Sequence, residues 1–323
     1  MEIPLQILLL IAGFIFLIKG ADLLVDGASS VASNFKISKL LIGLTIVAFG
    51  TGAPELAVSF SSLMNGSTDI LVGNVIGSNI INVLLLIGIA AIIRPIKVNK
   101  DTVSKELPLL LLISTALIIL LLDVNLAEAI INTFSRADAI ICLLFFCIFL
   151  YYLFSLAKKN KKEASEVEKP KYKLSKSFIF VIIGLIGVIG GSQLVVNSAS
   201  NIATTIGISE RIISLTIIAL GTSLPELITT IIAAKKKESD LLVGNIVGSN
   251  IFNICIVLAL PVAFAGGITP NNFEIIDLAM LIISSILLCV LARRGHKISR
   301  FDGILMLFIF MLYYGFIIYG ALV

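Results

Sequence analysis

The chain carries one segment twice. Residues 37–82 align without a gap on residues 208–253 at a constant offset of 171, and 22 of the 46 aligned positions are identical. Each copy holds one glutamate inside an apolar stretch, Glu55 in the first and Glu226 in the second. Ionisable side chains within membrane segments are costly and mark ion pathways, and many transporters are built from internal repeats. The duplication therefore indicates a membrane protein that handles cations.

The composition is that of a membrane protein. Of the 323 residues, 58% are hydrophobic and only 14% are charged. Apolar runs of 18 or more residues predict transmembrane helices. The ten candidate spans cover residues 4–33, 38–64, 69–93, 106–122, 137–157, 177–204, 209–234, 241–266, 274–292 and 302–321. Four cysteines, Cys142, Cys147, Cys255 and Cys289, lie in these apolar segments without the spacing of metal ligands or disulfides, and we expect them to be core residues.

The spans divide into two halves, residues 1–157 and 177–323, joined by a charged linker at 158–176. Loops that follow odd-numbered spans carry 21 of the 24 lysines and arginines, whereas loops after even-numbered spans carry only Arg136 and Arg211. Basic loops stay cytoplasmic, so both termini are expected outside and the linker inside. Because five spans are an odd number, the second half must be inverted. The sequence predicts an all-α integral membrane protein of ten transmembrane helices in two inverted five-helix repeats.

Within each repeat, the second span is predicted to be interrupted. The run A-F-G-T-G-A-P-E at 48–55 contains Pro54, whose missing N–H leaves the carbonyl of Gly50 without its helical partner. Irregular backbone at membrane depth survives only where it is buried in protein or lines a polar cavity. The freed carbonyls would lie beside Thr51 and Glu55, and the run A-L-G-T-S-L-P-E at 219–226 repeats the arrangement.

The next span of each repeat adds polar side chains at a spacing of four residues. They are Asn74, Ser78 and Asn82 in the first repeat, and Asn245, Ser249 and Asn253 in the second. If locally helical, each trio shares one face. Carboxylate, hydroxyl, amide and carbonyl oxygens suit Ca²⁺ and also Na⁺, whereas zinc or copper would call for His or Cys, and the only histidine, His296, lies in a loop. Two glutamates match one divalent ion, and other cations must replace it when it leaves, which favours exchange over leakage.

Each of these features also has a purely structural interpretation. Gly and Pro in membrane helices often serve packing and kinks, and Ser, Thr and Asn often only bond neighbouring helices. A glutamate at mid-membrane is harder to explain in this way, and its duplication in register is harder still. Asp22 and Asp26 are expected to be solvated near the cytoplasmic end of the first span, with Lys19 snorkelling or pairing with one of them.

Taken together, G-T-G-A-P-E with G-N-V-I-G-S-N-I-I-N, and G-T-S-L-P-E with G-N-I-V-G-S-N-I-F-N, resemble the two α-repeats of the sodium/calcium exchangers in the cation/calcium exchanger superfamily. The resemblance covers the whole chain, and the short linker resembles that of the prokaryotic members. It implies an antiporter of the prokaryotic plasma membrane that exchanges Ca²⁺ for Na⁺ by alternating access. The first and sixth spans would slide as a gate across the other eight. No cofactor, nucleic acid or partner subunit is implied, only the transported ions and the lipid bilayer.

The resemblance also implies roles for individual residues. Glu55 and Glu226 would be the central calcium ligands, shared with sodium. The further oxygen ligands it implies are Thr51, Thr222, Ser78, Ser249, Asn82, Asn253, Ser223 and the carbonyls of Ala48 and Ala219. The first repeat departs from the family pattern with Gly52 and Ala53 in place of Ser and Leu, which removes one hydroxyl from a sodium site.

Other functions stay open at this stage. Proton-driven or broader divalent exchange through the same site is the nearest alternative, although proton/calcium relatives usually carry an acid where this chain has Gly77 and Gly248. Asn253, where potassium-dependent relatives use an acid, speaks against co-transport of potassium. An intramembrane hydrolase would need a positioned water and paired aspartates or an activated serine, and no such motif occurs. A channel would not need an inverted duplication with broken helices.

Overall fold

A computed structural model of the chain describes residues 3–126, 131–162, 170–207, 219–270 and 275–322. Within these residues, eight helices are long and apolar enough to cross a membrane, and the bent pair Lys39–Thr51 and Ala53–Met64 makes a ninth. The expectation of an all-α integral membrane protein is confirmed. Residues 208–218, the first part of the expected seventh span, lie outside the described residues, so the count of ten stays a prediction.

The first half begins with the long helix α1 (Ile3–Phe35). The interrupted span follows as α2 (Lys39–Ile42), the π-helical segment η1 (Gly43–Val47), α3 (Ala48–Thr51) and α4 (Ala53–Met64). The next elements are α5 (Thr68–Ile80), η2 (Ile81–Leu86), α6 (Ile87–Ile93), β1 (Ile96–Lys97), η3 (Thr102–Glu106), α7 (Leu107–Leu121), α8 (Asp123–Leu126), β2 (Phe134–Ser135) and α9 (Arg136–Lys162).

The second half repeats this order. It runs through α10 (Leu174–Thr205), α12 (Ala219–Gly221), α13 (Leu224–Lys235), α14 (Ser239–Phe252), η6 (Asn253–Leu258), α15 (Ala259–Ala265), β3 (Gly267–Ile268), α16 (Ile275–Arg293), β4 (Lys297–Ile298) and α17 (Arg300–Leu322). The π-helical segments η2 and η6 begin at Ile81 and Asn253, one residue apart in the repeat numbering. Such widened turns are rare and often occur at functional sites.

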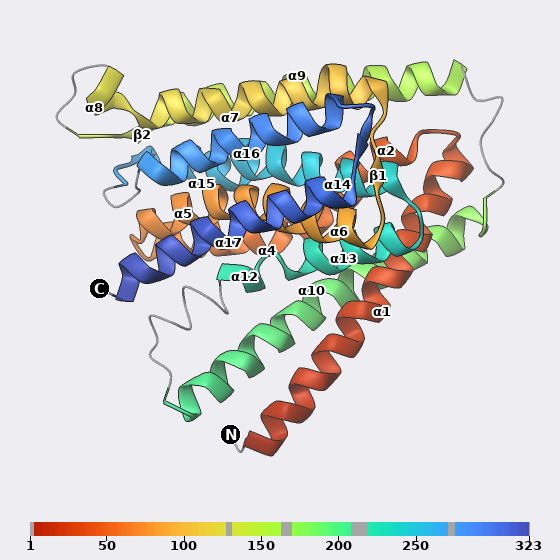
Figure 1. The fold of residues 1–323 in the computed structure, drawn as a ribbon, viewed down its shortest axis with the longest axis horizontal. Coiled ribbons are helices and arrows are strands. Elements are labelled where there is room, and N and C mark those ends of the chain that lie inside the picture. The colour runs from red at the N-terminus through yellow and green to blue at the C-terminus, as the bar shows by residue number, and fades with distance from the viewer. Residues whose placement is uncertain (1–2, 127–130, 163–169, 208–218, 271–274, 323) are drawn as a thin grey trace.

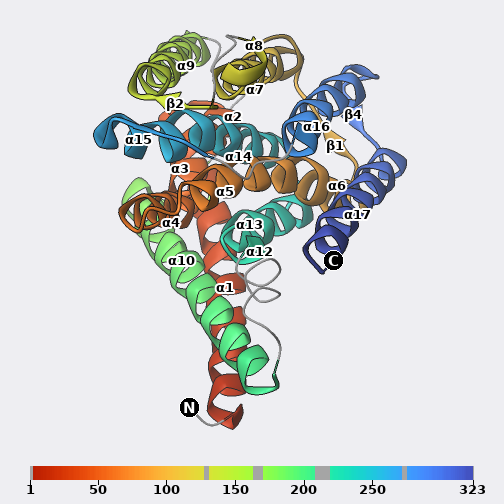
Figure 2. The ribbon, with the colours of Figure 1, turned by 90° about the vertical axis from the view of Figure 1, so that its left-hand side faces the viewer.

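Helices α1 and α10 pack against each other along their length and extend together away from the other helices (Figures 1 and 2). Glycine makes this close approach possible. A Cβ on Gly20 would lie 2.6 Å from the backbone nitrogen of Val188, and one on Gly184 would lie 2.6 Å from that of Leu24. In a membrane, small residues let helix backbones approach and gain van der Waals contact without a hydrophobic driving force. The two helices therefore form a tightly joined pair.

The most enclosed spans are those that carry the two asparagine motifs. The most apolar window of Ser239–Ala265 is 83% buried and that of Thr68–Ile93 is 72% buried, whereas the corresponding values for the other long helices lie between 22% and 44%. In a bilayer, a helix that is shielded on all sides by protein can hold polar side chains without exposing them to lipid. The repeats thus place their polar motifs at the centre of the bundle.

Contacts between loops define two ends of the molecule. At one end, β1 pairs with β4, Asn99 donates to the Asp240 carboxylate at 2.8 Å, and Lys39 pairs with Glu238 at 2.9 Å. At the other end, β2 pairs with β3. Loops that follow odd-numbered spans meet at the first end, and the loops that follow the second, fourth and eighth spans meet at the second. This alternation is what a chain crossing a bilayer back and forth requires.

Candidate cation-binding site

The two glutamates occupy equivalent positions at the start of a helix. Glu55 lies in the first turn of α4 and Glu226 in the first turn of α13, each directly after a proline. Because the preceding helix ends at Thr51 or Gly221, the predicted interruptions are present, and the first bends the span by 43°. The unpaired N–H groups and the dipole of a helix N-terminus favour a negative charge there. The broken helices therefore hold a carboxylate inside the protein.

Both carboxylates are enclosed and incompletely bonded. Glu55 is 2% exposed and Glu226 is 1% exposed, and the Oε2 atom of each has no hydrogen-bond partner within the described ranges. The two charges are near enough to repel each other. A pair of buried anions without compensating partners is strongly unfavourable, so the arrangement calls for a cation.

Side chains from opposite repeats meet around these glutamates. The hydroxyl of Thr51 donates to the carbonyl of Val47 at 3.0 Å and reaches Oδ1 of Asn245 at 3.4 Å, which links α3 to α14. Thr51 and Ser249 also lie near the Glu226 carboxylate. In the first repeat, Asn74 donates to the backbone carbonyl of Glu55 at 3.3 Å. Each glutamate is thus surrounded by polar groups of the asparagine motifs.

Four asparagines join the repeats across their symmetry axis. Asn79 Nδ2 donates to the Asn250 carbonyl at 3.2 Å, and Asn250 Nδ2 donates to the Asn79 carbonyl at 3.3 Å. Asn82 Nδ2 donates to Asn250 Oδ1 at 2.9 Å, and Asn253 Nδ2 donates to Asn79 Oδ1 at 3.2 Å. Each bond has a counterpart at the offset of 171. Sequence analysis missed Asn79 and Asn250, although their identity in both copies was a signal.

These bonds leave the oxygens of Asn82 and Asn253 available. In both residues Nδ2 is used, while Oδ1 is buried and has no partner in the part of the chain that the structure describes. The same holds for the hydroxyl oxygens of Ser223 and Ser249. Buried polar atoms nearly always have a partner in native proteins. Unmet carboxylate, amide and hydroxyl oxygens at one centre are the ligand set that a hard cation such as Ca²⁺ or Na⁺ satisfies.

The remaining predicted ligands lie on the same elements. Ser78 is 3% exposed on α5, and Thr222 follows α12 directly before Ser223. The carbonyl of Ala48 accepts a hydrogen bond from the Gly52 N–H at 3.0 Å and a longer one from the Thr51 hydroxyl at 3.5 Å. Ala219 is the first residue of α12. Within the described residues, His, Cys, Asp and Glu form no group of three that could hold a resident metal ion.

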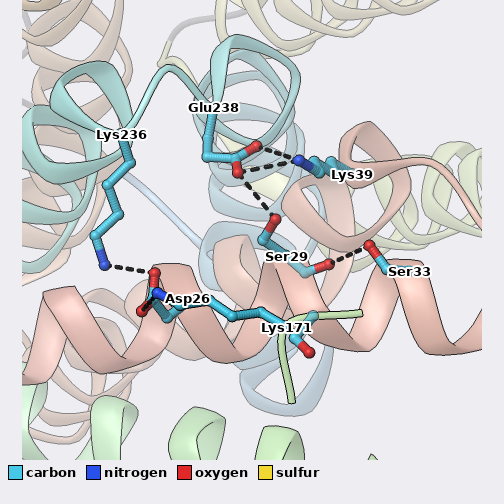
Figure 3. Close-up of a pocket in the computed structure, with 8 residues that line it drawn as sticks. Asp26, Ser29, Ser33, Lys39, Lys171, Lys236 and Glu238 are labelled. Atoms are coloured by element: carbon cyan, nitrogen blue, oxygen red, sulfur yellow. Dashed lines mark hydrogen bonds and ion pairs between the residues drawn. The ribbon is translucent and has the colours of Figure 1, made fainter. Parts of the chain in front are cut away.

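A second polar cluster lies at the end of the molecule where β1 and β4 pair. Asp26 on α1 pairs with both Lys236 and Lys171 at 2.7 Å, as Figure 3 shows for the cavity of about 320 Å³ around them. Glu238 pairs with Lys39 at 2.9 Å and accepts from the Ser29 hydroxyl at 3.0 Å. These contacts tie α1 to the α13–α14 turn and to the segment that precedes α10. We name Asp26, Lys171, Lys236, Glu238 and Lys39 the ion-pair cluster.

The expectation of solvation is wrong for Asp26, whereas Asp22 is half-exposed. The Asp26 side chain is only 19% exposed because two ammonium groups cover it, and the half-exposed Asp22 also pairs with Lys236 at 2.7 Å. Their partners are 145 to 214 residues distant in sequence, so the first span alone could not reveal them.

Comparison with known proteins decides the family. A family model described as "Sodium/calcium exchanger protein" matches residues 5–155 and 176–319. The chain belongs to the sodium/calcium exchanger family. This exchanger is 38% identical to the inner membrane protein YrbG of Escherichia coli over 92% of each chain, and 27% identical to the sodium/calcium exchanger MaX1 of Methanosarcina acetivorans over 98% of each chain.

A solved structure shares the exchanger's fold. The sodium-calcium exchanger NCX_Mj, soaked with 10 mM Na⁺ and no Ca²⁺, superimposes with a TM-score of 0.82 at 34% identity, covering 98% of this chain and 99% of that one. The resemblance inferred from the sequence motifs is therefore confirmed. It also establishes this chain as a multi-pass membrane transporter.

Proposed function

We propose that this protein is a secondary antiporter that exchanges Ca²⁺ for Na⁺ through the centre between Glu55 and Glu226. The observation that carries the proposal is the pair of buried carboxylates, each with an oxygen that has no partner within the described residues, at the centre of an inverted duplication. Together they supply a formal charge of −2, which one Ca²⁺ neutralises. The relatives named sodium/calcium exchangers support this choice of ions.

The ligand assignment is part of this proposal. Glu55 and Glu226 would bind Ca²⁺ directly and Na⁺ in its absence, because each carboxylate must be compensated in both states. The unmet oxygens of Asn82, Asn253, Ser223 and Ser249 support their roles beside the carboxylates. The other proposed ligands are Thr51, Thr222, Ser78 and the carbonyls of Ala48 and Ala219. The site would act within a single copy of the chain.

The packing at Gly248 favours Na⁺ over protons as the driving ion. A Cβ on Gly248 would lie 2.8 Å from both the Ala48 Cβ and the Leu44 Cα. An acidic side chain at this position, which proton/calcium relatives usually carry, would force α14 away from α3 and η1, whereas a side chain at the equivalent Gly77 would meet nothing within 4 Å among the described residues, so the packing argument holds for the second repeat alone. Proton-driven exchange through the same carboxylates is the alternative that the transport assay distinguishes.

The distribution of charge supports an orientation. Lysines and arginines gather in the loops at the end of the ion-pair cluster, including Lys97, Lys171, Lys236 and Lys297. By the positive-inside rule, we propose that this end faces the cytoplasm and that both termini lie outside. The relative YrbG is named an inner membrane protein, which supports a prokaryotic plasma membrane for this chain.

Transport by the purified protein in liposomes tests the proposal. Liposomes loaded with Na⁺ and diluted into Na⁺-free buffer with radioactive Ca²⁺ are expected to take up Ca²⁺, and Glu55→Gln and Glu226→Gln are each expected to lower the initial rate at least 100-fold. A Lys105→Gln variant, which changes an exposed ion pair with Asp101, is the control and should keep the wild-type rate. Uptake that ignores Na⁺ but follows a pH gradient would assign proton exchange instead. Uptake without any counter-ion gradient would indicate a channel.

A further inference from the structure

The two repeats hold a pair of equivalent asparagines differently. In the first repeat, Asn74 Nδ2 donates to the backbone carbonyl of Glu55 at 3.3 Å and to the hydroxyl of Ser59 at 3.4 Å. At the offset of 171, the equivalent residues are Asn245, Glu226 and Thr230. However, Asn245 Nδ2 and the Thr230 hydroxyl are both buried without a hydrogen-bond partner in the described structure. The bonds of the first repeat are therefore not formed in the second.

Asn245 contacts the opposite repeat instead. Its Oδ1 accepts from the Thr51 hydroxyl at 3.4 Å, and Thr51 also lies beside the Glu226 carboxylate. The side-chain amide of Asn245 is thus held toward the centre by α3. The Thr230 hydroxyl, which lies one turn beyond Glu226 on α13, stays unused.

Ordinary helix geometry does not account for the unused hydroxyl of Thr230. A threonine in a helix commonly donates to the carbonyl four residues earlier, as Thr45, Thr115 and Thr204 do at 2.7, 2.8 and 2.9 Å. Within the described residues, the Thr230 hydroxyl makes no such bond, although the side chain is fully buried. Because a buried polar atom nearly always has a partner, this hydroxyl calls for one that a second conformation of the protein can supply.

The formed and the unformed bonds lie on opposite sides of the centre. Helix α4 carries Ser59 from Glu55 toward the end of the molecule where β2 and β3 pair. Helix α13 carries Thr230 from Glu226 toward the ion-pair cluster, which ties the α13–α14 turn to α1. The bond of Asn74 is thus formed on the side away from the cluster, and the equivalent bond is missing on the side that the cluster closes.

We propose that Asn74 and Asn245 are positioning residues that exchange partners when the site changes sides. As the cytoplasmic end opens, Asn245 bonds Thr230 and the Glu226 carbonyl, and Asn74 gives up Ser59. If the two inverted repeats exchange their conformations between the access states, the contacts of one repeat become those of the other. The helix that holds each glutamate is thereby tied to the side that is open. This inference rests on the proposed function as a transporter, but not on which ions it carries.

The ratio of the two access states tests this exchange of partners. Spin labels on Lys36→Cys and Lys237→Cys, in a cysteine-free background, report by pulsed electron paramagnetic resonance whether the cytoplasmic end is open. Ser59→Ala removes a bond of the closed state alone and should raise the ratio of open to closed molecules about fivefold, which is the effect of one hydrogen bond. Adding Thr230→Val removes the replacing bond of the open state and should return the ratio to the wild-type value.

Two matched variants separate the exchange from a loss of packing. Thr229 is the neighbouring buried threonine, its hydroxyl also has no partner in the part of the chain described, and its equivalent Val58 has no hydroxyl. Ser59→Ala with Thr229→Val should therefore keep the fivefold rise, as should Ser59→Ala with Thr230→Ser. The inference is refuted if Ser59→Ala alone shows no rise, if adding Thr230→Val leaves the rise in place, or if Thr229→Val abolishes it equally. Because the distances are measured without transport, a lack of Na⁺-dependent Ca²⁺ uptake would refute only the proposed function.

Discussion

The ion-pair cluster is expected to hold the site closed toward the cytoplasm. Helix α1 packs along α13, which carries Glu226, so an opening at this end must separate α1 from the α13–α14 turn. That separation breaks the contacts of Asp26 with Lys236 and Lys171, both 2.7 Å long. Asp26→Asn is the informative change because the equivalent residue in the second repeat is Asn197. It removes the charge and keeps the shape.

The expected size of the effect follows from the exposure of the partners. The side chains of Asp26 and Lys236 are 19% and 25% exposed, whereas Lys171 is 63% exposed, so the pair with Lys236 contributes most. Partly exposed pairs contribute up to about 1 kcal/mol. Losing about 1 kcal/mol raises the ratio of cytoplasm-open to cytoplasm-closed molecules about fivefold. Asp26 raises the pKa of Lys171 to about 12, above its unfolded value, so the contribution of the Lys171 pair is complete at neutral pH and up to about pH 10, and it is lost as pH rises through about 12.

Distances between spin labels measure this shift. In a cysteine-free background, Lys36 and Lys237 are each replaced by cysteine and spin-labelled. Pulsed electron paramagnetic resonance then measures the distance between the loop after α1 and the α13–α14 turn. Asp26→Asn should increase the long-distance population about fivefold, and Asp22→Asn should increase it less than twofold, because Asp22 is 50% exposed and its Lys236 partner keeps Asp26. The reasoning is refuted if Asp26→Asn leaves the distance distribution unchanged, or if both variants shift it equally.

Three further substitutions test the packing. Asn79→Ala should lower the free energy of unfolding by roughly 2–4 kcal/mol, seen as a lower melting temperature in detergent, because the Asn250 carbonyl loses its side-chain donor and the Asn253 amide loses its acceptor. Gly184→Ala should cost about 1–3 kcal/mol by pushing α1 from α10, and Gly190→Ala, which has open space, is its control in the same melting assay. Tyr152→Phe should cost roughly 1–3 kcal/mol because the buried Glu106 loses its hydroxyl donor, and combining it with Glu106→Gln should restore most of the loss in melting temperature.

Long-range symmetry made most of this fold predictable. The offset of 171 relates the broken helices, the asparagine motifs and both glutamates, and hydropathy locates the spans. Helix boundaries among the described residues agree with the expected spans to within three residues, apart from α9, which continues five residues beyond its expected end to Lys162, and α7, whose span begins four residues early in η3. A pattern repeated twice in one chain carries more information than either copy alone.

Features that depend on tertiary contact were not predictable in this way. The π-helical segments η2 and η6 have the same apolar character as ordinary helix, and no local signal marks their extra residue per turn. The pairing of Asn79 with Asn250 follows only once two helices cross at the axis. The sequence did not show that Asp26 is covered, because the lysines that cover it come from the linker and from the second repeat. The spacing within one span indicated that Asn74, Ser78 and Asn82 share one helix face, but it did not show which residues pack against that face.

The four asparagine bonds between the repeats have a consequence for how the protein can move. If the two access states of an inverted repeat are generated by the repeats exchanging their conformations, the exchange maps Asn79 onto Asn250 and Asn82 onto Asn253. The set of bonds is then the same before and after the movement. A change at the axis would weaken both states to the same extent and leave their ratio untouched, whereas a change in the one-sided ion-pair cluster would alter the ratio. On that condition, the four asparagine bonds would stabilise both access states equally, and the ion-pair cluster would set the ratio between them.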